Sequence, residues 1–233
     1  MAKRERSSGW VARDALIAAV ISGLLVGVPS TVIASNISGQ FAQSLANQAT
    51  CANPQDLTLL SGNSISATGA SLSYPTTSGT FSYPPDQLVD GTRSTAWVSA
   101  DTATLGVGST VTLTLPHDVD LRLICVLNGY AKGADYEMNA SVQVVEVATD
   151  RGKRDATLPA LTADNAFDYQ PLAFTPGKTS TVTLTMLVVD PPVHPDPSEG
   201  PVSATMSEVE LWTSSDSRDF PAALLCPALC ISG

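Results

Sequence analysis

Two stretches of the chain alternate between threonine and an apolar residue: "TVTLTL" at 110–115 and residues 181–186 within "STVTLTMLVV" at 180–189. Successive side chains of a β-strand point to opposite faces, so this alternation gives one apolar and one polar face. The apolar positions are Val111, Leu113, Leu115, Val182, Leu184 and Met186. We therefore predict that both stretches are half-buried strands, a state that valine and threonine favour.

Shorter apolar or alternating runs continue the pattern on both sides of these two stretches. They are "LTLL" at 57, "ASLSY" at 70, "LRLICVL" at 121, "VQVVEVA" at 142 and "SEVELW" at 207. The segments between them carry proline, glycine and aspartate, which end strands, and show no amphipathic helical pattern. These segments read "SYPPDQ", "DRGKRD", "FTPGKTS" and "DPPVHPDPSEGP". Residues 57–213 are therefore predicted to form an all-β domain, an antiparallel sandwich or jelly roll.

The N-terminal part of the chain has a different character. Residues 15–34 are uncharged and mostly apolar, and four basic side chains precede them within residues 1–14. A helix that spans a bilayer needs roughly 20 apolar residues, and flanking basic residues stay on the cytoplasmic side. We expect a single-pass transmembrane helix, a signal anchor at 15–35, with residues 1–14 in the cytoplasm. A helical or linker stalk at 36–56 would lead to the extracellular domain.

A cleaved signal peptide is the alternative interpretation of the same segment. Its apolar region is usually about 7–15 residues long and ends at a small-x-small site, such as "VIA" before Ser35 or "SLA" before Asn47. The observed run is longer, and Ile37, Phe41 and Leu45 continue it at helical spacing, which favours the anchor. Either interpretation places the domain outside the cytoplasm, at the cell membrane or as a secreted protein.

The charge of the exported part argues against two classes of partner. Of the 12 basic and 22 acidic side chains, four and two lie in residues 1–14, so the rest of the chain has a net charge of −12. Nucleic acids and anionic lipid headgroups are bound through Lys and Arg, and after residue 14 the 8 basic side chains are outnumbered by 20 acidic ones. We therefore expect no nucleic-acid partner.

The four cysteines fit an exported protein, because disulfides form outside the cytoplasm. None belongs to a C-x-x-C pair and only two histidines are present, so a zinc site is not expected. Cys125 lies in an apolar run and is predicted to be a buried, unpaired thiol. Cys51 opens the folded region and Cys226 and Cys230 close it, so we predict a bridge from Cys51 to one of these two.

The C-terminal segment, residues 214–233, ends in an apolar stretch that contains proline and two cysteines. It is too short to span a membrane and too rich in proline for a long helix. We expect it to pack on the domain, on the membrane or on a protein partner.

A hydrolase is the enzyme class that an exported domain first suggests. The chain has no G-x-S-x-G sequence, and neither His117 nor His194 lies beside a serine or cysteine nucleophile. Acidic residues are plentiful, but the sequence singles out no pair for glycoside cleavage. We therefore expect no enzyme and keep a hydrolase as the third hypothesis.

The segment "DGTRSTAW" at 90–97 allows two interpretations. Its carboxylate, hydroxyls and carbonyls are oxygen ligands that suit a hard cation such as Ca²⁺. Alternatively, Asp90 caps a turn through the backbone and no ion binds. Trp97 follows at the start of a strand and is large enough to fill a core.

The segment "NGYAKG" at 128–133 predicts a turn at Asn128–Gly129, at the rim of the sandwich where loops often carry binding function. Aromatic rings with amide and ammonium donors suit the faces and hydroxyls of sugars, although an ordinary surface loop has the same composition. The residues that we expect to contact a ligand are Asn128, Tyr130, Lys132, Tyr136 and Asn139.

Together these motifs resemble the galactose-binding-like, discoidin-type jelly rolls and, more narrowly, the NADase-type glycan-binding domain of exported and membrane-anchored bacterial proteins. The resemblance covers about residues 57–213. It is carried by "LVDGTRSTAW", "STVTLTLP", "VLNGYAKG", "YEMNASVQVVEVATDRG" and "SEVELW". The first and third of these are specific and the others are loose. The family's name refers to a domain attached to some NAD-cleaving toxins, and no catalytic part of such an enzyme is visible here.

The resemblance implies a carbohydrate-binding jelly roll and the structural Ca²⁺ site of the wider superfamily. Carried over by position, the metal ligands are Asp90, Thr95 and Glu208, with Glu210 as the rival of Glu208. The preceding loop, "SYPPDQ", does not match the family's ligands securely.

Two hypotheses about function follow. In the first, the chain is a membrane-anchored, extracytoplasmic domain that binds glycan or cell-wall polysaccharide without catalysis. In the second, it is a structural or assembly subunit of a membrane complex, which binds a protein partner through the jelly roll and the tail at 214–233.

Overall fold

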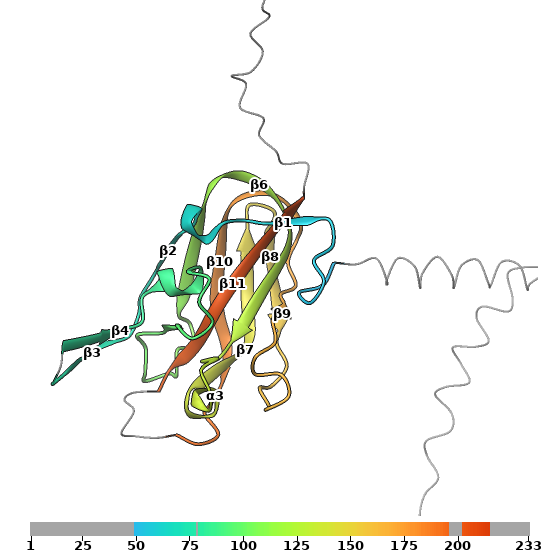
Figure 1. Ribbon diagram of the computed structural model, residues 1–233. Helices are drawn as coiled ribbons and strands as arrows, with labels where there is room; N and C mark the ends of the chain where they lie inside the picture. The colour runs from blue at the N-terminus through green and yellow to red at the C-terminus, as the bar shows by residue number, and fades with distance from the viewer. Residues whose placement is uncertain (1–48, 78, 196–201, 215–233) are drawn as a thin grey trace, which may run out of the picture. The chain divides into compact units, whose positions relative to one another are not determined.

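The computed structural model describes residues 49–77, 79–195 and 202–214, and these form a β-domain (Figure 1). Its strands are β1 (Leu57–Leu59), β2 (Ser66–Gly69), β3 (Ser73–Thr76), β4 (Gly79–Ser82), β5 (Trp97–Val98), β6 (Thr110–Asn128), β7 (Ala140–Thr149), β8 (Gly152–Thr157), β9 (Gln170–Pro171), β10 (Gly177–Asp190) and β11 (Ala204–Ser214). Helical structure in this part of the chain is limited to the 3₁₀ turns η1 (Gly62–Ser64) and η2 (Pro85–Leu88) and the four-residue helix α3 (Asp135–Met138). The prediction of an all-β, largely antiparallel domain is confirmed.

Several predicted segments lie outside the described residues. They are the cytoplasmic segment, the anchor at 15–35, the stalk up to residue 48, and the tail beyond residue 214 with Cys226 and Cys230. In the ranges that the structure does describe, no helix is both long and apolar enough to cross a membrane.

Strand β6 connects the two layers of the domain. Nine strands form one hydrogen-bonded sheet in the order β1-β11-β6-β10-β7-β8, with β2 and β9 also paired to β6 and β5 paired to β11. The first half of β6 pairs with β10 and β2, whereas its second half pairs with β11 and β9. Figure 1 shows β6 arching over the top of the domain between these halves. The sheet thereby folds on itself into a sandwich.

The two threonine-rich stretches are partners in this sheet. Leu113 lies opposite Val182 and Val111 opposite Leu184, in antiparallel register. On the other face the hydroxyl groups of Thr112 and Thr183 lie 3.2 Å apart. The alternation therefore builds an apolar face toward the core and a row of threonine pairs on the outside, as cross-strand pairing requires.

The core lies between the layers and draws residues from both halves of β6. Trp97 is fully buried, as predicted, and its indole N–H donates to the Ala70 carbonyl at 3.1 Å. Around it pack apolar side chains of β6, β7, β10 and β11, among them Val111, Leu113, Ile124, Val126, Val145, Val147, Val182, Leu184, Met186, Val209 and Leu211.

Three local predictions are corrected. "TVTLTL" and "LRLICVL" belong to one 19-residue strand rather than two, because the chain stays extended through Pro116–Asp120 as it changes layer. "DRGKRD" is not a loop throughout, since β8 begins at Gly152 and pairs with β7. "FTPGKTS" likewise ends in β10, which begins at Gly177.

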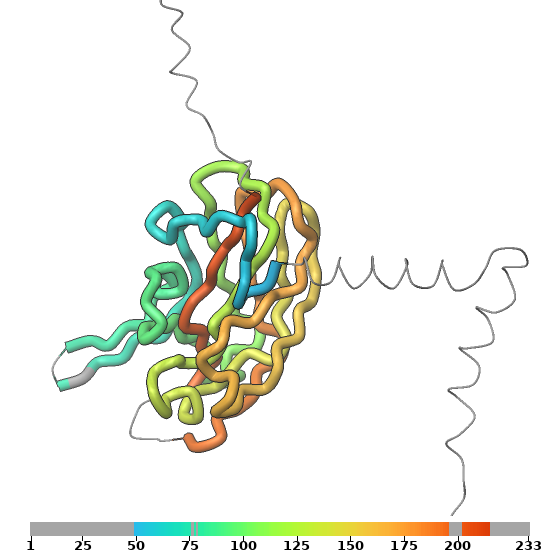
Figure 2. Tube along the Cα trace, turned by 45° about the vertical axis from the view of Figure 1, so that its right-hand side comes forward, coloured from blue at the N-terminus to red at the C-terminus, as the bar shows by residue number. Residues whose placement is uncertain are grey.

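Strands β3 and β4 form a separate two-stranded ribbon, which projects from the sandwich in both Figure 1 and Figure 2. Tyr74 pairs with Phe81 across the ribbon, and Ser73 with Ser82. Because neighbouring pairs face opposite ways, Tyr74 and Phe81 share one face of the ribbon, and the other face carries Ser73, Ser82, Pro75 and Thr80.

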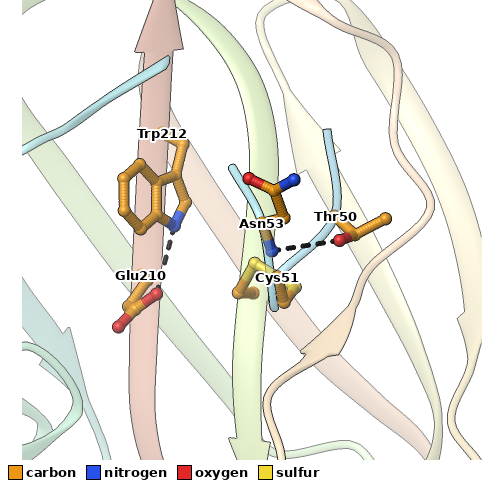
Figure 3. Close-up of a disulfide and its surroundings, with 6 residues drawn as sticks. Thr50, Cys51, Asn53, Glu210 and Trp212 are labelled. Atoms are coloured by element: carbon orange, nitrogen blue, oxygen red, sulfur yellow. Dashed lines mark hydrogen bonds between the residues drawn. A yellow bond between two sulfur atoms is a disulfide. The ribbon is translucent and has the colours of Figure 1, made fainter. Parts of the chain in front are cut away.

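A disulfide joins Cys51 to Cys125, in the middle of the second half of β6 (Figure 3). Residues 49–56, which fall in the predicted stalk, are bent into turns beside it, where the Thr50 hydroxyl accepts a hydrogen bond from the Asn53 amide. Figure 3 places the bridge beside β11, whose Trp212 donates its indole N–H to Glu210.

The bridge corrects the prediction for the cysteines. Cys125 is buried, as expected, but it is not an unpaired thiol, and it takes the place assigned to Cys226 or Cys230. The physical reason is that Cys125 points to the face of β6 opposite the sandwich core, where the segment around Cys51 covers it.

Replacing Cys51 with serine is expected to lower the free energy of unfolding by about 2–4 kcal/mol, because the bridge closes a long loop in the unfolded chain. Urea denaturation of the full chain, with and without reductant, measures this loss. Reductant should destabilise the wild type to the level of the variant and leave the variant unchanged. Equal stability of both proteins under oxidising conditions would contradict a bridge that stabilises the fold.

Candidate functional site

Asn128 is the last residue of β6, and its side chain connects the end of this strand to β7. It is 1% exposed, and its Nδ2 donates to the Val142 carbonyl at 2.8 Å while its Oδ1 accepts from the Val142 amide at 3.0 Å. Oδ1 also accepts from the Gly129 amide at 3.0 Å. The amide therefore replaces a backbone partner, and Asn128 is not on the surface where we expected it to contact a ligand.

Gly129 follows with a φ of +70°, a conformation that favours glycine. A Cβ at this position would lie 2.5 Å from Cδ1 of Leu161 and 3.9 Å from Cβ of Ser141. The turn predicted at Asn128–Gly129 thus has a second role, since the missing side chain lets Leu161 pack closely.

Leu161 and Ser141 belong to a pocket of about 360 Å³ beside α3. Ser141 and Gln143 come from β7, and Asp190 from the end of β10, where it lies opposite Ser141 in the sheet. The remaining lining residues are Tyr136, Asn139, Ala160, Leu161, Pro191, Pro192 and Val193. The wall at 191–193 is tied to α3 through the His194 amide, which donates to the Glu137 carbonyl at 2.9 Å.

Two of the predicted ligand contacts, Tyr136 and Asn139, line this pocket. The Tyr136 hydroxyl donates to the Glu137 carboxylate at 2.8 Å, and this bond is the main reason why the pKa of Tyr136 is raised. Its ring contacts Phe167 edge-on, with centroids 5.9 Å apart. The Asn139 Nδ2 donates to the Asp135 carbonyl at 2.8 Å, which orients the amide.

The other two predicted contacts, Tyr130 and Lys132, form a separate group. The Lys132 Nζ lies 5.8 Å from the centre of the Tyr130 ring, within the range of a cation–π contact. Tyr130 also meets Tyr83 edge-on, with centroids 6.3 Å apart. Burial is the main cause of the raised pKa of Tyr130.

The sequence pattern did not identify the polar pocket residues Ser141, Gln143 and Asp190. In the sequence, each of these residues looks like an ordinary outward-facing position of a strand. The pattern of neither strand indicates that they come together in space. The aromatic residues of the ribbon carried a usable signal, since Tyr74 and Phe81 lie symmetrically about a glycine-containing turn.

The loop of Asp90 has the geometry of a capped turn. The Asp90 Oδ1 accepts from the Thr92 amide at 2.7 Å, and the Thr95 hydroxyl lies 2.9 Å from Oδ2. The same hydroxyl lies 2.6 Å from the Thr92 carbonyl. Asp90 and Thr95 are thus brought together as the sequence suggested, within a turn that holds its shape through its own hydrogen bonds.

Glu208 faces this loop from β11. It is 4% exposed; its Oε1 accepts from the Gly91 amide at 3.4 Å, and its buried Oε2 has no hydrogen-bond partner among the described residues. Burial, reinforced by the carboxylates of Asp90 and Glu210 and opposed by the Gly91 amide, raises the pKa of Glu208 to about 7. A buried carboxylate oxygen without a partner calls for an explanation.

These groups fit a Ca²⁺ ion in their chemistry. Three hard oxygen ligands are available here: the Glu208 carboxylate oxygen that has no partner among the described residues, the Asp90 carboxylate and the Thr95 hydroxyl. Within the described ranges no group of three or more His, Cys, Asp or Glu side chains is placed to hold a metal, so backbone carbonyls would have to complete the ligand set.

Glu210, the rival of Glu208, has other partners. Its Oε2 accepts from the Trp212 indole at 3.1 Å, and it contributes with Glu208 to a raised pKa of about 12 for Tyr169, for which burial is the main cause. The Arg93 guanidinium lies over the Tyr169 ring at 4.7 Å. The Glu210 carboxylate therefore already has a hydrogen-bond partner in Trp212. Glu208, in contrast, has a buried oxygen without a hydrogen-bond partner among the described residues.

In buffer with EDTA, the free energy of unfolding should fall as the pH rises from about 4.5 to 8. Glu208 has a pKa of about 7 in the folded state and about 4.5 when unfolded, so the folded state holds the extra proton between these values. This stabilisation, about 3 kcal/mol, is complete below pH 4.5 and lost as the pH rises through 7.

Urea denaturation across this pH range measures the effect, with Glu208→Gln as the variant and Asp118→Asn, an exposed carboxylate on the bend of β6, as the control. Glu208→Gln should remove this part of the pH dependence and Asp118→Asn should keep it. An unchanged pH dependence in Glu208→Gln would refute the assignment.

Comparison with known proteins agrees with the resemblance found in the sequence. Residues 61–190 match the sequence model of a family described as the NAD glycohydrolase translocation F5/8 type C domain. No curated protein matches the chain.

Similar solved structures include a family 32 carbohydrate-binding module from Clostridium perfringens in complex with galactose, 13% identical, covering 67% of this chain and 98% of that one, with a TM-score of 0.44. A second module from the same organism, in complex with GalNAc-β-1,3-galactose, is 15% identical over 66% and 99% of the two chains, with a TM-score of 0.42. The F5/8 type C domain of a Bacteroides fragilis protein is 16% identical over 69% and 99%, with a TM-score of 0.49. On the strength of the family match, which spans more than half of its residues, the chain belongs to the NAD glycohydrolase translocation F5/8 type C domain family.

Proposed function

We propose that this chain binds glycan without catalysis, and that the pocket beside α3 holds one sugar unit. The pocket is the observation that carries the proposal. Its volume of about 360 Å³ lies in the range of small-molecule sites, and it combines an aromatic ring with a few convergent polar groups. Membership of a family of F5/8 type C domains supports a binding role.

The groups in the pocket match the chemistry of a neutral sugar. Asp190, Gln143 and Ser141 offer acceptors and donors for ring hydroxyls, and the Tyr136 ring offers an apolar face. The carboxylate of Asp190 disfavours acidic sugars, because like charges in a partly buried site repel. We therefore expect neutral or N-acetylated sugars as ligands.

The absence of a reaction is part of the proposal. Glycoside hydrolysis usually needs two carboxyl groups that flank the scissile bond. Among the described residues that line the pocket, Asp190 is the single acid. One carboxylate can accept hydrogen bonds from a sugar, but it does not supply both the general acid and the base or nucleophile.

We further propose that the domain works outside the cytoplasm, anchored by residues 15–35. The disulfide between Cys51 and Cys125 supports this location, since such bridges persist in oxidising compartments. The anchor itself lies outside the described residues, and the basic segment before it remains the argument for its orientation.

Binding should appear on an array of neutral glycans, with galactose and N-acetylgalactosamine as the first test sugars. Asn139→Ala and Asp190→Ala are each expected to weaken binding by roughly tenfold or more, because each removes a hydrogen bond to the sugar. Lys178→Ala, an exposed change at the start of β10, should bind like the wild type. No binding by the full chain to any glycan, or equal binding by all variants, would refute the proposal.

We also propose that Ca²⁺ braces the Asp90 loop through Glu208. Ca²⁺ should raise the thermal midpoint of unfolding, with a stabilisation of about 2.7 kcal/mol at roughly 100 times its dissociation constant. The gain should be larger at pH 8 than at pH 5, because the metal binds the ionised carboxylate of Glu208.

Scanning calorimetry with Ca²⁺, Mg²⁺ and EDTA checks this site independently of glycan. Glu208→Gln and Asp90→Asn should abolish the gain, whereas Glu146→Gln on β7 should retain it. A thermal midpoint that does not respond to Ca²⁺ at either pH would show that Asp90 only caps its turn.

A further inference from the structure

One loop of the domain contacts both the pocket and the Asp90 loop. It is the segment between β8 and β9, residues 158–169, and we call it the wall loop. Its first part supplies Ala160 and Leu161 to the lining of the pocket. Its last residue, Tyr169, lies under the guanidinium of Arg93, which belongs to the Asp90 loop. Figure 1 shows the wall loop at the end of the domain where α3 lies.

The wall loop is braced by its own hydrogen bonds. The Asn165 Oδ1 accepts from the Thr162 amide at 2.8 Å, and the Asn165 Nδ2 donates to the Ala160 carbonyl at 3.0 Å. The amide of Ala166 donates to the Thr162 carbonyl at 2.9 Å. The amide of Asp168 donates to the Asn165 carbonyl at 3.1 Å. Because these bonds hold the middle of the wall loop in one shape, a displacement of one end is passed to the other.

Side-chain contacts at three points hold the wall loop on the domain. Leu161 packs closely against the turn that follows β6. Phe167 meets the pocket residue Tyr136 edge-on, with ring centroids 5.9 Å apart. At the third point, the guanidinium carbon of Arg93 lies 4.7 Å from the centre of the Tyr169 ring. The first two contacts involve lining residues of the pocket, whereas the third lies outside the lining.

The Asp90 loop fixes the backbone on both sides of Arg93. Before it, the Thr92 amide donates to the Asp90 carboxylate at 2.7 Å. After it, the Thr95 amide donates to the Thr92 carbonyl at 3.1 Å, which closes a tight turn around Arg93. The position from which the guanidinium reaches Tyr169 is therefore set by a turn that holds its own shape.

The charges around Tyr169 favour the contact with Arg93. Burial is the main cause of the raised pKa of Tyr169, about 12, and the carboxylates of Glu210 and Glu208 on β11 add to it. Arg93 acts on the same phenol in the opposite direction. A cation above this ring is attracted by the face of the ring and by the negative charge around it. Arg93 is itself exposed, so the core does not require its side chain.

We propose that Arg93 is a positioning residue for the pocket, because its contact with Tyr169 keeps the wall loop where its first part closes the sugar site. This rests on the function proposed for the pocket. Arg93 does not line the pocket, so it acts through the wall loop. Without this contact, the wall loop occupies its binding-competent position for a smaller fraction of the time, and the apparent affinity for sugar falls by that fraction.

A concentration series of the full chain on an array of neutral glycans gives the dissociation constant for each sugar that binds. Arg93→Ala is expected to weaken binding by about two- to fivefold, the effect of one cation–π contact near the surface. Arg93→Lys keeps a cation that can reach the ring and should restore most of the affinity. Arg151→Ala, which removes an exposed arginine from the turn between β7 and β8, should bind like the wild type.

A double-mutant cycle separates positioning from a general loss of stability. Tyr169→Leu keeps apolar bulk but removes the ring that Arg93 contacts, and it is expected to weaken binding at least as much as Arg93→Ala. The double variant should then bind like Tyr169→Leu alone, because Arg93 has no ring left to hold. A thermal melt verifies that each variant is folded.

Equal affinity of the wild type and Arg93→Ala would overturn this inference and leave the pocket's function standing. The same conclusion would follow if the double variant lost the full Arg93 effect in addition to that of Tyr169→Leu. Equal losses in Arg93→Ala and Arg151→Ala would also overturn it, since they would reflect net charge. Failure of the wild type to bind any neutral glycan would overturn both proposals.

Discussion

The whole domain depends on one strand being hydrogen-bonded in both layers. Strand β6 pairs with β10 in its first half and with β11 in its second, so its side chains must face the same core from two directions. Both halves are therefore apolar on the inner face, with Val111 and Leu113 before the bend and Ile124 and Val126 after it. The side-chain amide of Asn128 then fixes the end of β6 to Val142 of β7 through two hydrogen bonds. These bonds set the position of the turn beside the pocket.

Sequence patterns predicted those parts of the fold that depend on neighbours along the chain. The alternation at 110–115 and 181–186 identified two strands, and the size of Trp97 identified a core residue. The patterns could not show that the two stretches pair with each other, because register is a contact between distant residues. Cys125 shows the same limit. From the sequence alone, a cysteine in an apolar strand that forms a disulfide cannot be distinguished from one that is buried in the core as a free thiol.

The candidate site illustrates a further limit. "NGYAKG" marked the correct end of the sandwich, but its first residue is buried, and its Tyr130 contacts Lys132 and Tyr83. The pocket is lined instead by Tyr136 and Asn139, which follow the motif. A turn places its side chains in several directions, so a cluster along the chain is not a cluster in space. Ser141 and Asp190, which do meet, are 49 positions apart and become neighbours only through the pairing of β7 with β10.

The disulfide determines where mechanical load would enter this domain. If the chain is held from the side of residue 48, a pull reaches Cys51 before it reaches β1, and the bridge passes it directly to Cys125 within the sheet. The residues between the two cysteines, 52–124, are then bypassed, and they include β1, the ribbon and the Asp90 loop. Force is borne by a strand hydrogen-bonded on both edges, which must shear several pairs at once, so the ribbon and the Asp90 loop keep their shape under tension.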